Sequence, residues 1–195
     1  MRRALPILAV VVIVALVAGG LTQAGGGTED PAAPAGERFD LAGARERLRG
    51  APEPLAALHE QSNQLLGGGR PAFEARMREL EGHPVVINKW ASWCGPCRAE
   101  FPILQALSTE RGREVAFLGV DSRDKRGAGT RFLADFPVPY PSYEDPGEEI
   151  ARALRVPKNF PVTVFVEASG RTAFVHHGGY RSEADLAADV DRLLG

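Results

Sequence analysis

Apolar residues in this chain of 195 residues recur in two patterns, one typical of strands and the other of helices. Short apolar runs, two of them flanking a turn at Ser169-Gly170, predict strands at 84–90, 115–120, 162–167 and 172–177. Apolar positions three and four residues apart predict helices at 39–49, 54–64, 72–81, 130–136 and 145–154, one that begins near Cys94, and a last one after Ser182. We therefore expect an α/β domain whose main elements follow the order β-α-β-α-β-β-α.

The only two cysteines lie directly after the first predicted strand, in the sequence Trp93-Cys94-Gly95-Pro96-Cys97. A pair at this spacing can close a small disulfide ring at the start of a helix. Pro96 suits a first helical turn, because the N–H that it lacks would be unpaired there. The free N–H groups and the helix dipole would favour a thiolate at Cys94. Since Cys97 lies one turn further in and is expected to be more buried, we predict that Cys94 is the nucleophile and Cys97 the resolving thiol.

Two other roles are open to a cysteine pair at this spacing. Half of a zinc site is one, but zinc takes four ligands and a second CxxC is absent. None of the four histidines repeats a metal-ligand spacing with the cysteines. An inert structural disulfide is the other, but so short a loop removes little chain entropy. The pattern favours a redox-active dithiol, and we expect neither a metal nor a cofactor.

The stretch from Lys89 to Pro102, KWASWCGPCRAEFP, resembles the membrane-tethered thioredoxin-like thiol–disulfide oxidoreductases of the TlpA/ResA group. The resemblance runs from about Leu65 to the end of the chain, and implies the thioredoxin fold, with a central mixed β-sheet flanked by helices. Thioredoxin has a buried Asp two residues before the Trp of this strand, where the present chain has Asn88. Glu100 matches an acidic residue typical of the tethered group, which implies a substitute acid or base near the dithiol. Lys89 either touches the site or lies at a strand edge.

Two arguments give opposite predictions for the peptide bond between Phe160 and Pro161, one trans and one cis. Only about 5–6% of X–Pro bonds in folded proteins are cis, which predicts a trans bond. The family resemblance instead implies a cis-proline packed against the dithiol. A cis bond would expose the backbone of Phe160 beside Cys94, where a substrate segment could pair with it as an added strand. The expected substrate-binding residues are Trp93, Gly95, Pro96, Phe160 and Pro161.

An uncharged segment near the N-terminus, from Ala4 to Leu21, predicts a membrane anchor. Its length falls within the range of about 17–25 residues that cross a bilayer as a helix. Arg2 and Arg3 before it predict a cytoplasmic N-terminus and an extracytoplasmic domain. A signal peptide cleaved after Thr22-Gln23-Ala24 is the alternative. Either way the domain would work where disulfides persist.

The chain therefore divides into three predicted parts. Residues 1–24 are the transmembrane anchor or signal segment, residues 25–52 a flexible linker with a short helix, and residues 53–195 the thioredoxin-like domain. The linker begins with a stretch rich in Gly, Pro and Ala, which is typical of a flexible spacer.

Charge and resemblance together indicate the class of partner. A net charge of −2 and a pI near 6.1 argue against nucleic-acid binding, which usually needs a basic face. The resemblance implies a reductant of protein disulfides, with apocytochrome c as a candidate substrate and a membrane electron donor of the CcdA/DsbD type. A disulfide-forming oxidant, a thiol peroxidase and a non-catalytic binding module are the alternatives. A peroxidase would want a lone peroxidatic cysteine rather than a pair.

Overall fold

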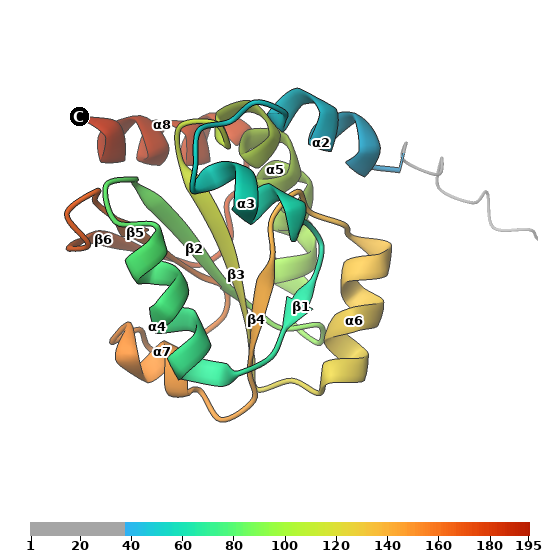
Figure 1. The fold of residues 1–195 in the computed structure, drawn as a ribbon. Coiled ribbons are helices and arrows are strands. Elements are labelled where there is room, and N and C mark those ends of the chain that lie inside the picture. Colours follow the sequence, from blue (N-terminus) through green and yellow to red (C-terminus); the bar gives the residue numbers. More distant parts are fainter. Residues whose placement is uncertain (1–37) are drawn as a thin grey trace, which may run out of the picture. The chain divides into compact units, whose positions relative to one another are not determined.

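The computed structural model describes residues 38–195, where a six-stranded sheet carries helices on both faces (Figure 1). The strands are β1 (Leu65–Leu66), β2 (Val85–Trp90), β3 (Ala116–Ser122), β4 (Ser142–Asp145), β5 (Val162–Val166) and β6 (Thr172–His177). The helices are α2 (Leu41–Leu48), α3 (Leu55–Glu60), α4 (Gly69–Glu79), α5 (Gly95–Arg111), α6 (Arg126–Asp135), α7 (Glu149–Ala153) and α8 (Glu183–Leu194). Phe39–Gly195 forms one compact unit.

The sheet is mixed, and its strand order is β1-β4-β3-β2-β5-β6. The strands β1, β4, β3 and β2 run parallel, whereas β5 is antiparallel to β2 and β6 is antiparallel to β5. Every residue of β2 is buried, because helices cover both of its faces. Two-sided burial explains why this strand reads as a nearly continuous apolar run in the sequence.

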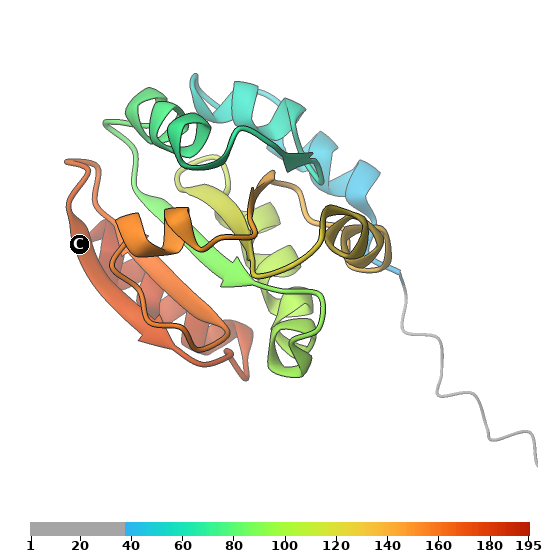
Figure 2. The same cartoon turned by 90° about the horizontal axis from the view of Figure 1, so that it is seen from below.

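Alternation along β2 separates two cores, which lie on opposite faces of the sheet between the two layers of helices in Figure 2. Val86 and Trp90 pack with α5, α6 and α8, whereas Val85 and Ile87 pack with α3, α4 and α7. Because side chains of a strand alternate between faces, Asn88 points toward α5 and Lys89 toward the α7 side. Two polar neighbours in the sequence are therefore sent to opposite sides of the sheet.

The helix expected at 145–154 is wrong in its first part. Ser142–Asp145 instead forms β4, which lies between β1 and β3, and α7 begins only at Glu149. Asp145 ends the strand and stabilises the helix, because its carboxylate accepts hydrogen bonds from the backbone N–H groups of Ile150 and Ala151, both at 3.0 Å. Asp145 therefore belongs to the strand but caps the helix that follows it.

Helix α6 begins at Arg126, earlier than the expected start at Thr130. The earlier turn contains Gly129, which is packed so closely on the Asp121 carboxylate that a Cβ atom there would collide with it. This glycine is present because of close packing and does not break the helix.

Helix α2 belongs to the compact unit, and its buried residues Ala44 and Leu48 pack toward α5. The predicted anchor, Ala4–Leu21, and the predicted spacer at 25–36 lie outside the described residues. Within residues 38–195, none of the helices has both the length and the apolar character needed to cross a membrane.

Candidate active site

Cys94 and Cys97 are joined by a disulfide at the start of α5. Cys94 is the N-cap residue of the helix, and its Sγ accepts a hydrogen bond from the Cys97 backbone N–H at 3.1 Å. Pro96 lies in the first turn, as its missing N–H predicts. In this disulfide form Cys94 is 4% exposed and Cys97 fully buried, so the expected difference in exposure is small. The chemical difference is clear, however, since the sulfur at the helix N-terminus is that of Cys94.

An exposed aromatic pair adjoins the disulfide. Trp93 is 56% exposed, and its ring meets the ring of Phe160 edge to face with centroids 4.9 Å apart. The indole N–H of Trp93 donates to the Arg123 carbonyl at 3.1 Å, which fixes the orientation of the ring. The residue immediately before Cys94 thus offers an apolar surface to solvent and packs against Phe160. Gly95 is exposed as well, and leaves the approach to the disulfide free of a side chain.

The peptide bond between Phe160 and Pro161 is cis, as the family resemblance implied and statistics alone did not. Pro161 is buried, and its carbonyl accepts a hydrogen bond from the Gly178 N–H at 3.0 Å. This bond ties the start of β5 to the segment that follows β6. A second cis bond, between Glu53 and Pro54, was not predicted.

Gly179 is the point where three parts of the site meet, and sequence reasoning missed it. A Cβ atom at this residue would lie 3.3 Å from the Pro96 carbonyl oxygen, 3.6 Å from Glu100 Oε2 and 3.6 Å from Pro161 Cγ. The cysteine loop, the buried acid and the cis-proline are therefore neighbours around one glycine. A glycine after a strand is common, so only these long-range contacts could reveal its role.

Glu100 lies on the dithiol helix α5, three residues after Cys97, and is completely buried. Its Oε1 accepts a hydrogen bond from Asn88 Nδ2 at 2.8 Å, and its Oε2 accepts one from the Tyr180 backbone N–H at 3.2 Å. Residues three apart on a helix lie on the same face, so the carboxyl group and the Cys97 side chain share one side of α5. The residue at the position of the thioredoxin Asp is thus a hydrogen-bond donor to Glu100.

Burial raises the pKa of Glu100 from its ordinary value of 4.5 to about 7, against the lowering effect of the hydrogen bonds from Asn88 and Tyr180. A group with a pKa near 7 can both accept and donate a proton at neutral pH. Asn88 Oδ1 is buried and has no hydrogen-bond partner among residues 38–195. If the Asn88 amide turned over, this oxygen could accept a hydrogen bond from a protonated Glu100.

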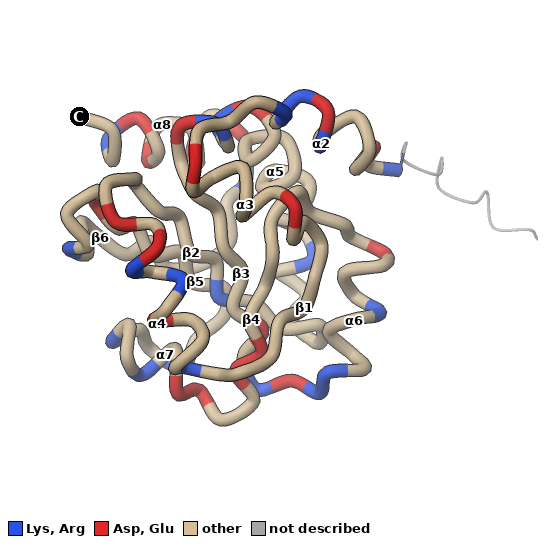
Figure 3. Tube along the Cα trace, viewed as in Figure 1, with Lys and Arg blue, Asp and Glu red and all other residues tan. Residues whose placement is uncertain are grey.

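Asp121 is a second buried acid, near the end of β3, and Asp124 lies next to it in a segment that the sequence analysis did not connect with the site. Asp124 Oδ2 accepts a hydrogen bond from the Ser92 backbone N–H at 2.6 Å, and so holds the turn that leads to Cys94. Asp121 is also buried, and its Oδ1 has no hydrogen-bond partner in the described part of the chain. Burial, with the like charges of Asp124 and Glu144, raises the pKa of Asp121 to about 8. The loop from β3 to α6 that carries Asp124 bears charges of both signs (Figure 3).

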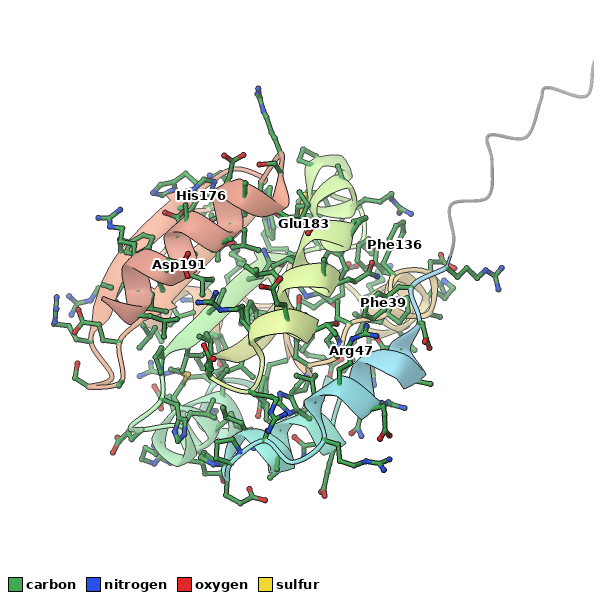
Figure 4. The ribbon with its side chains drawn as sticks, turned by 90° about the horizontal axis from the view of Figure 1, so that it is seen from above. Phe39, Arg47, Phe136, His176, Glu183 and Asp191 are labelled. Carbon is green, nitrogen blue, oxygen red and sulfur yellow. A yellow bond between two sulfur atoms is a disulfide. The ribbon has the colours of Figure 1, made fainter. Side chains whose placement is uncertain are left out.

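The adjacent histidines near the end of β6 do not converge on one site. His176 is half-buried beside α8 (Figure 4), where its ring stacks on Tyr180 at 4.0 Å and its Nδ1 lies 3.4 Å from Asp189. His177 is exposed. Their different surroundings agree with the alternation of side chains along a strand.

Comparison with known proteins identifies the family. Residues 73–190 match the family model described as Redoxin, which spans more than half of the chain. The chain belongs to the redoxin family. The matched residues include the cysteine pair, Glu100 and the cis-proline, and so contain the whole of the site described above.

Relatives of this redoxin are thiol–disulfide exchange proteins. It is 31% identical over 121 residues to the thiol:disulfide interchange protein DsbE of Pseudomonas fluorescens biotype C, covering 57% of this chain and 66% of that protein. It is 33% identical to HelX of Rhodobacter capsulatus, covering 66% and 70%. It is 28% identical to the thiol-disulfide oxidoreductase ResA of Oceanobacillus iheyensis, covering 62% and 58%. The matches span about two thirds or less of the first and last of these relatives, and they confirm the resemblance to the ResA group.

Solved structures confirm the thioredoxin-like fold of this redoxin. A putative DsbE from Chlorobium tepidum superimposes with a TM-score of 0.56 at 26% identity, covering 61% of this chain and 85% of that one. A thioredoxin family protein from Chlorobium tepidum TLS gives a TM-score of 0.55 at 26% identity, covering 60% and 84%. A secreted thiol-disulfide isomerase from Corynebacterium glutamicum gives 0.53 at 29% identity, covering 57% and 71%.

Proposed function

We propose that this redoxin is an extracytoplasmic thiol–disulfide oxidoreductase that reduces protein disulfides. The observation that carries the proposal is the Cys94–Cys97 disulfide at the N-terminus of α5, with the Cys97 N–H directed at Cys94 Sγ. A sulfur in that position is stabilised as a thiolate, which is the form that attacks disulfides and leaves them. The pair can therefore alternate between a disulfide and a dithiol.

The first step begins with the reduced protein. The Cys94 thiolate attacks one sulfur of a substrate disulfide and forms a mixed disulfide. The other substrate sulfur leaves as a thiolate and takes a proton from solvent. Trp93 and Phe160 supply an apolar surface beside the reacting sulfurs, and the backbone at Phe160 pairs with the substrate segment as an added strand.

The second step resolves the mixed disulfide. The Glu100 carboxylate takes the proton of the Cys97 thiol, and the resulting thiolate attacks Cys94 Sγ. The second substrate sulfur leaves as a thiolate and is protonated. The disulfide of the protein is restored, and two electrons have passed from the dithiol to the substrate. A pKa of Glu100 near 7 supports this role, because the carboxylate is available at neutral pH.

The chain outside the described residues supports a tethered enzyme. The uncharged segment from Ala4 to Leu21 would anchor it, and the stretch at 25–36 would act as a spacer. We propose that a membrane electron donor of the CcdA/DsbD type returns the disulfide to the dithiol. Recovery of the full-length protein in the membrane fraction after an alkali wash is expected, whereas a soluble form beginning near Gly25 would indicate a cleaved signal peptide.

Trapping of the mixed disulfide tests the function. Cys97→Ser removes the resolving thiol, so substrates should stay attached through Cys94 until a reductant is added. The double variant Cys94→Ser, Cys97→Ser is the matched control and should trap nothing. Apocytochrome c among the trapped proteins would support a role in cytochrome c maturation, and a broad set of secreted proteins would support general disulfide reduction. If the single variant is folded and traps no protein, the proposed function is wrong.

A further inference from the structure

Lys89 carries a buried positive charge in the strand that leads to the cysteine loop. Its side chain is 1% exposed, although an ammonium group loses strong hydration when it is buried. A cation in such a place is retained only with good partners. Its surroundings show why it is tolerated here, and what it holds.

Within residues 38–195, the Lys89 ammonium makes its polar contacts with one segment, 148–160, which runs from the N-cap of α7 to the residue before the cis-proline. Its Nζ lies 3.1 Å from Glu148 Oε1 and donates to the Pro157 carbonyl at 2.9 Å. It also lies 4.1 Å from the centroid of the Phe160 ring, within the range of a cation–π contact. Three different partners from one segment thus converge on a single side chain.

These contacts continue to the reacting sulfurs. Phe160 meets Trp93, which directly precedes Cys94. Phe160 also forms the cis bond with Pro161, whose ring lies next to Gly179 and the cysteine loop. The charge therefore holds the site from the α7 side of the sheet, while Glu100 lies on the other side, as alternation along β2 requires.

We propose that Lys89 is a positioning residue, which holds the segment Pro157–Pro161 in the conformation that binds the chain of a protein substrate. The proposal rests on the proposed function and adds a basis for its preference for protein disulfides. Lys89 touches neither sulfur, so its effect passes through Phe160. A small disulfide needs access to Cys94 but no pairing with the Phe160 backbone, and its reduction does not depend on Lys89.

Four variants separate this role from a merely stabilising ion pair. Lys89→Met removes the cation, Glu148→Gln removes only its charged partner, and the double variant removes both charges so that no buried ion is left unpaired. Arg111→Met is the matched control, because Arg111 also forms an ion pair, with Asp191 at 2.7 Å, but at the far end of α5. Each variant is reduced with dithiothreitol, which is then removed, and the reduced protein is assayed for reduction of insulin and of 5,5′-dithiobis(2-nitrobenzoic acid), with KM taken as the concentration of either disulfide that gives half of the maximal rate.

Lys89→Met and the double variant should raise KM for insulin about tenfold, the size expected when hydrogen bonding to a charged group is lost. Both should leave reduction of the small disulfide unchanged. Glu148→Gln, which keeps the contacts with Pro157 and Phe160, should have a smaller effect, and Arg111→Met none. Amide hydrogen exchange of peptides spanning 154–162 should be faster in both variants that lack Lys89.

The outcomes distinguish the two levels of the proposal. If the wild-type protein reduced neither insulin nor the small disulfide, the proposed function itself would be overturned. Normal KM for insulin in the folded double variant, with unchanged exchange at 154–162, would overturn the role of Lys89 alone. An equal loss toward both disulfides would also overturn it, because that result would place Lys89 in the chemistry or in general stability.

Discussion

Replacing Glu100 with Gln should change how stability depends on pH. Folding raises the pKa of this carboxyl group from 4.5 to about 7, so the folded protein keeps the proton to higher pH than the unfolded chain does. The stability that protonated Glu100 contributes is therefore fully present below about pH 4.5 and is lost as the pH rises from there to about 7. Above pH 7 this contribution no longer changes. At about 1.4 kcal/mol for each pH unit, Glu100 destabilises the folded state by about 3 kcal/mol at pH 8.

Glutamine is a suitable replacement because the site can satisfy its amide. The Gln oxygen can accept from the Tyr180 N–H, as Glu100 Oε2 does now. The Gln amide can donate to Asn88 Oδ1 once the Asn88 side chain turns over, and this oxygen has no partner in the present structure. The variant thus imitates protonated Glu100, and we expect little loss of packing.

Urea unfolding of the oxidised protein between pH 4.5 and 8.5 measures the effect. The Glu100→Gln variant should match the wild-type protein at the acidic end and be about 3 kcal/mol more stable at pH 8. Asp121, whose pKa is also raised, adds its own pH dependence to both proteins and cancels in the difference. Glu110→Gln, an exposed change on the same helix, is the control and should give no pH-dependent difference.

Activity gives a second measurement of the same group. Loss of a positioned acid or base typically slows a reaction by about 10²–10⁴-fold, so Glu100→Gln should reduce protein disulfides at least about 100-fold more slowly at neutral pH. The wild-type rate should increase as Glu100 ionises near pH 7, and the variant should lack this dependence. The reasoning would be refuted if the difference in unfolding free energy between Glu100→Gln and the wild-type protein did not change with pH, and if the variant also kept the pH–rate profile of the wild-type protein.

Three further predictions concern neighbours of the dithiol. Gly179→Ala should lower kcat/KM for a protein disulfide about tenfold or more, since its Cβ would lie 3.3 Å from the Pro96 carbonyl oxygen and displace the cysteine loop. Gly127→Ala in α6 is the control, and equal kcat/KM values for the two variants would contradict the prediction. Asp121→Asn should stabilise the protein in urea unfolding by an amount that grows with pH up to about 8, because the raised pKa of Asp121 makes the stability of the wild-type protein fall over that range. A loss of stability, or a gain that does not change with pH, would contradict the prediction. Trp93→Ala should raise KM for insulin about tenfold without affecting a small disulfide, since the exposed ring offers substrate an apolar contact; an unchanged KM would count against that contact.

Sequence by itself determined the chemistry and its local setting. The strand that ends at Trp90, the helix start at Cys94 and the first-turn Pro96 all follow from short-range rules on periodicity and capping, and the structure agrees with each. Such rules work here because strand, turn and helix start are consecutive in the chain, and each residue favours the same local conformation. The cis bond before Pro161 was expected only through the family resemblance, since the residues near it favour trans.

Tertiary structure decided which groups surround that chemistry. Ser142–Asp145 became a strand because β1 and β3 pair with it, although its last residue, Asp145, was expected to begin a helix. Glu100 acquires its pKa from burial and from partners at Asn88 and Tyr180, the latter 80 positions away. The spacing between Cys97 and Glu100 predicts neither the burial of Glu100 nor its two hydrogen-bond partners.

Lys89 and Gly179 show the same limit most clearly. A lysine in an apolar strand could lie at an edge or in the site, and only the approach of the segment 148–160 decided that it is buried and paired. Gly179 acquires its role from Pro96 and Glu100 of α5 and from Pro161 before β5, which all come within van der Waals range of one point. Local preference determines which conformation a segment adopts, whereas burial, pKa and close contact depend on which distant segments pack against it.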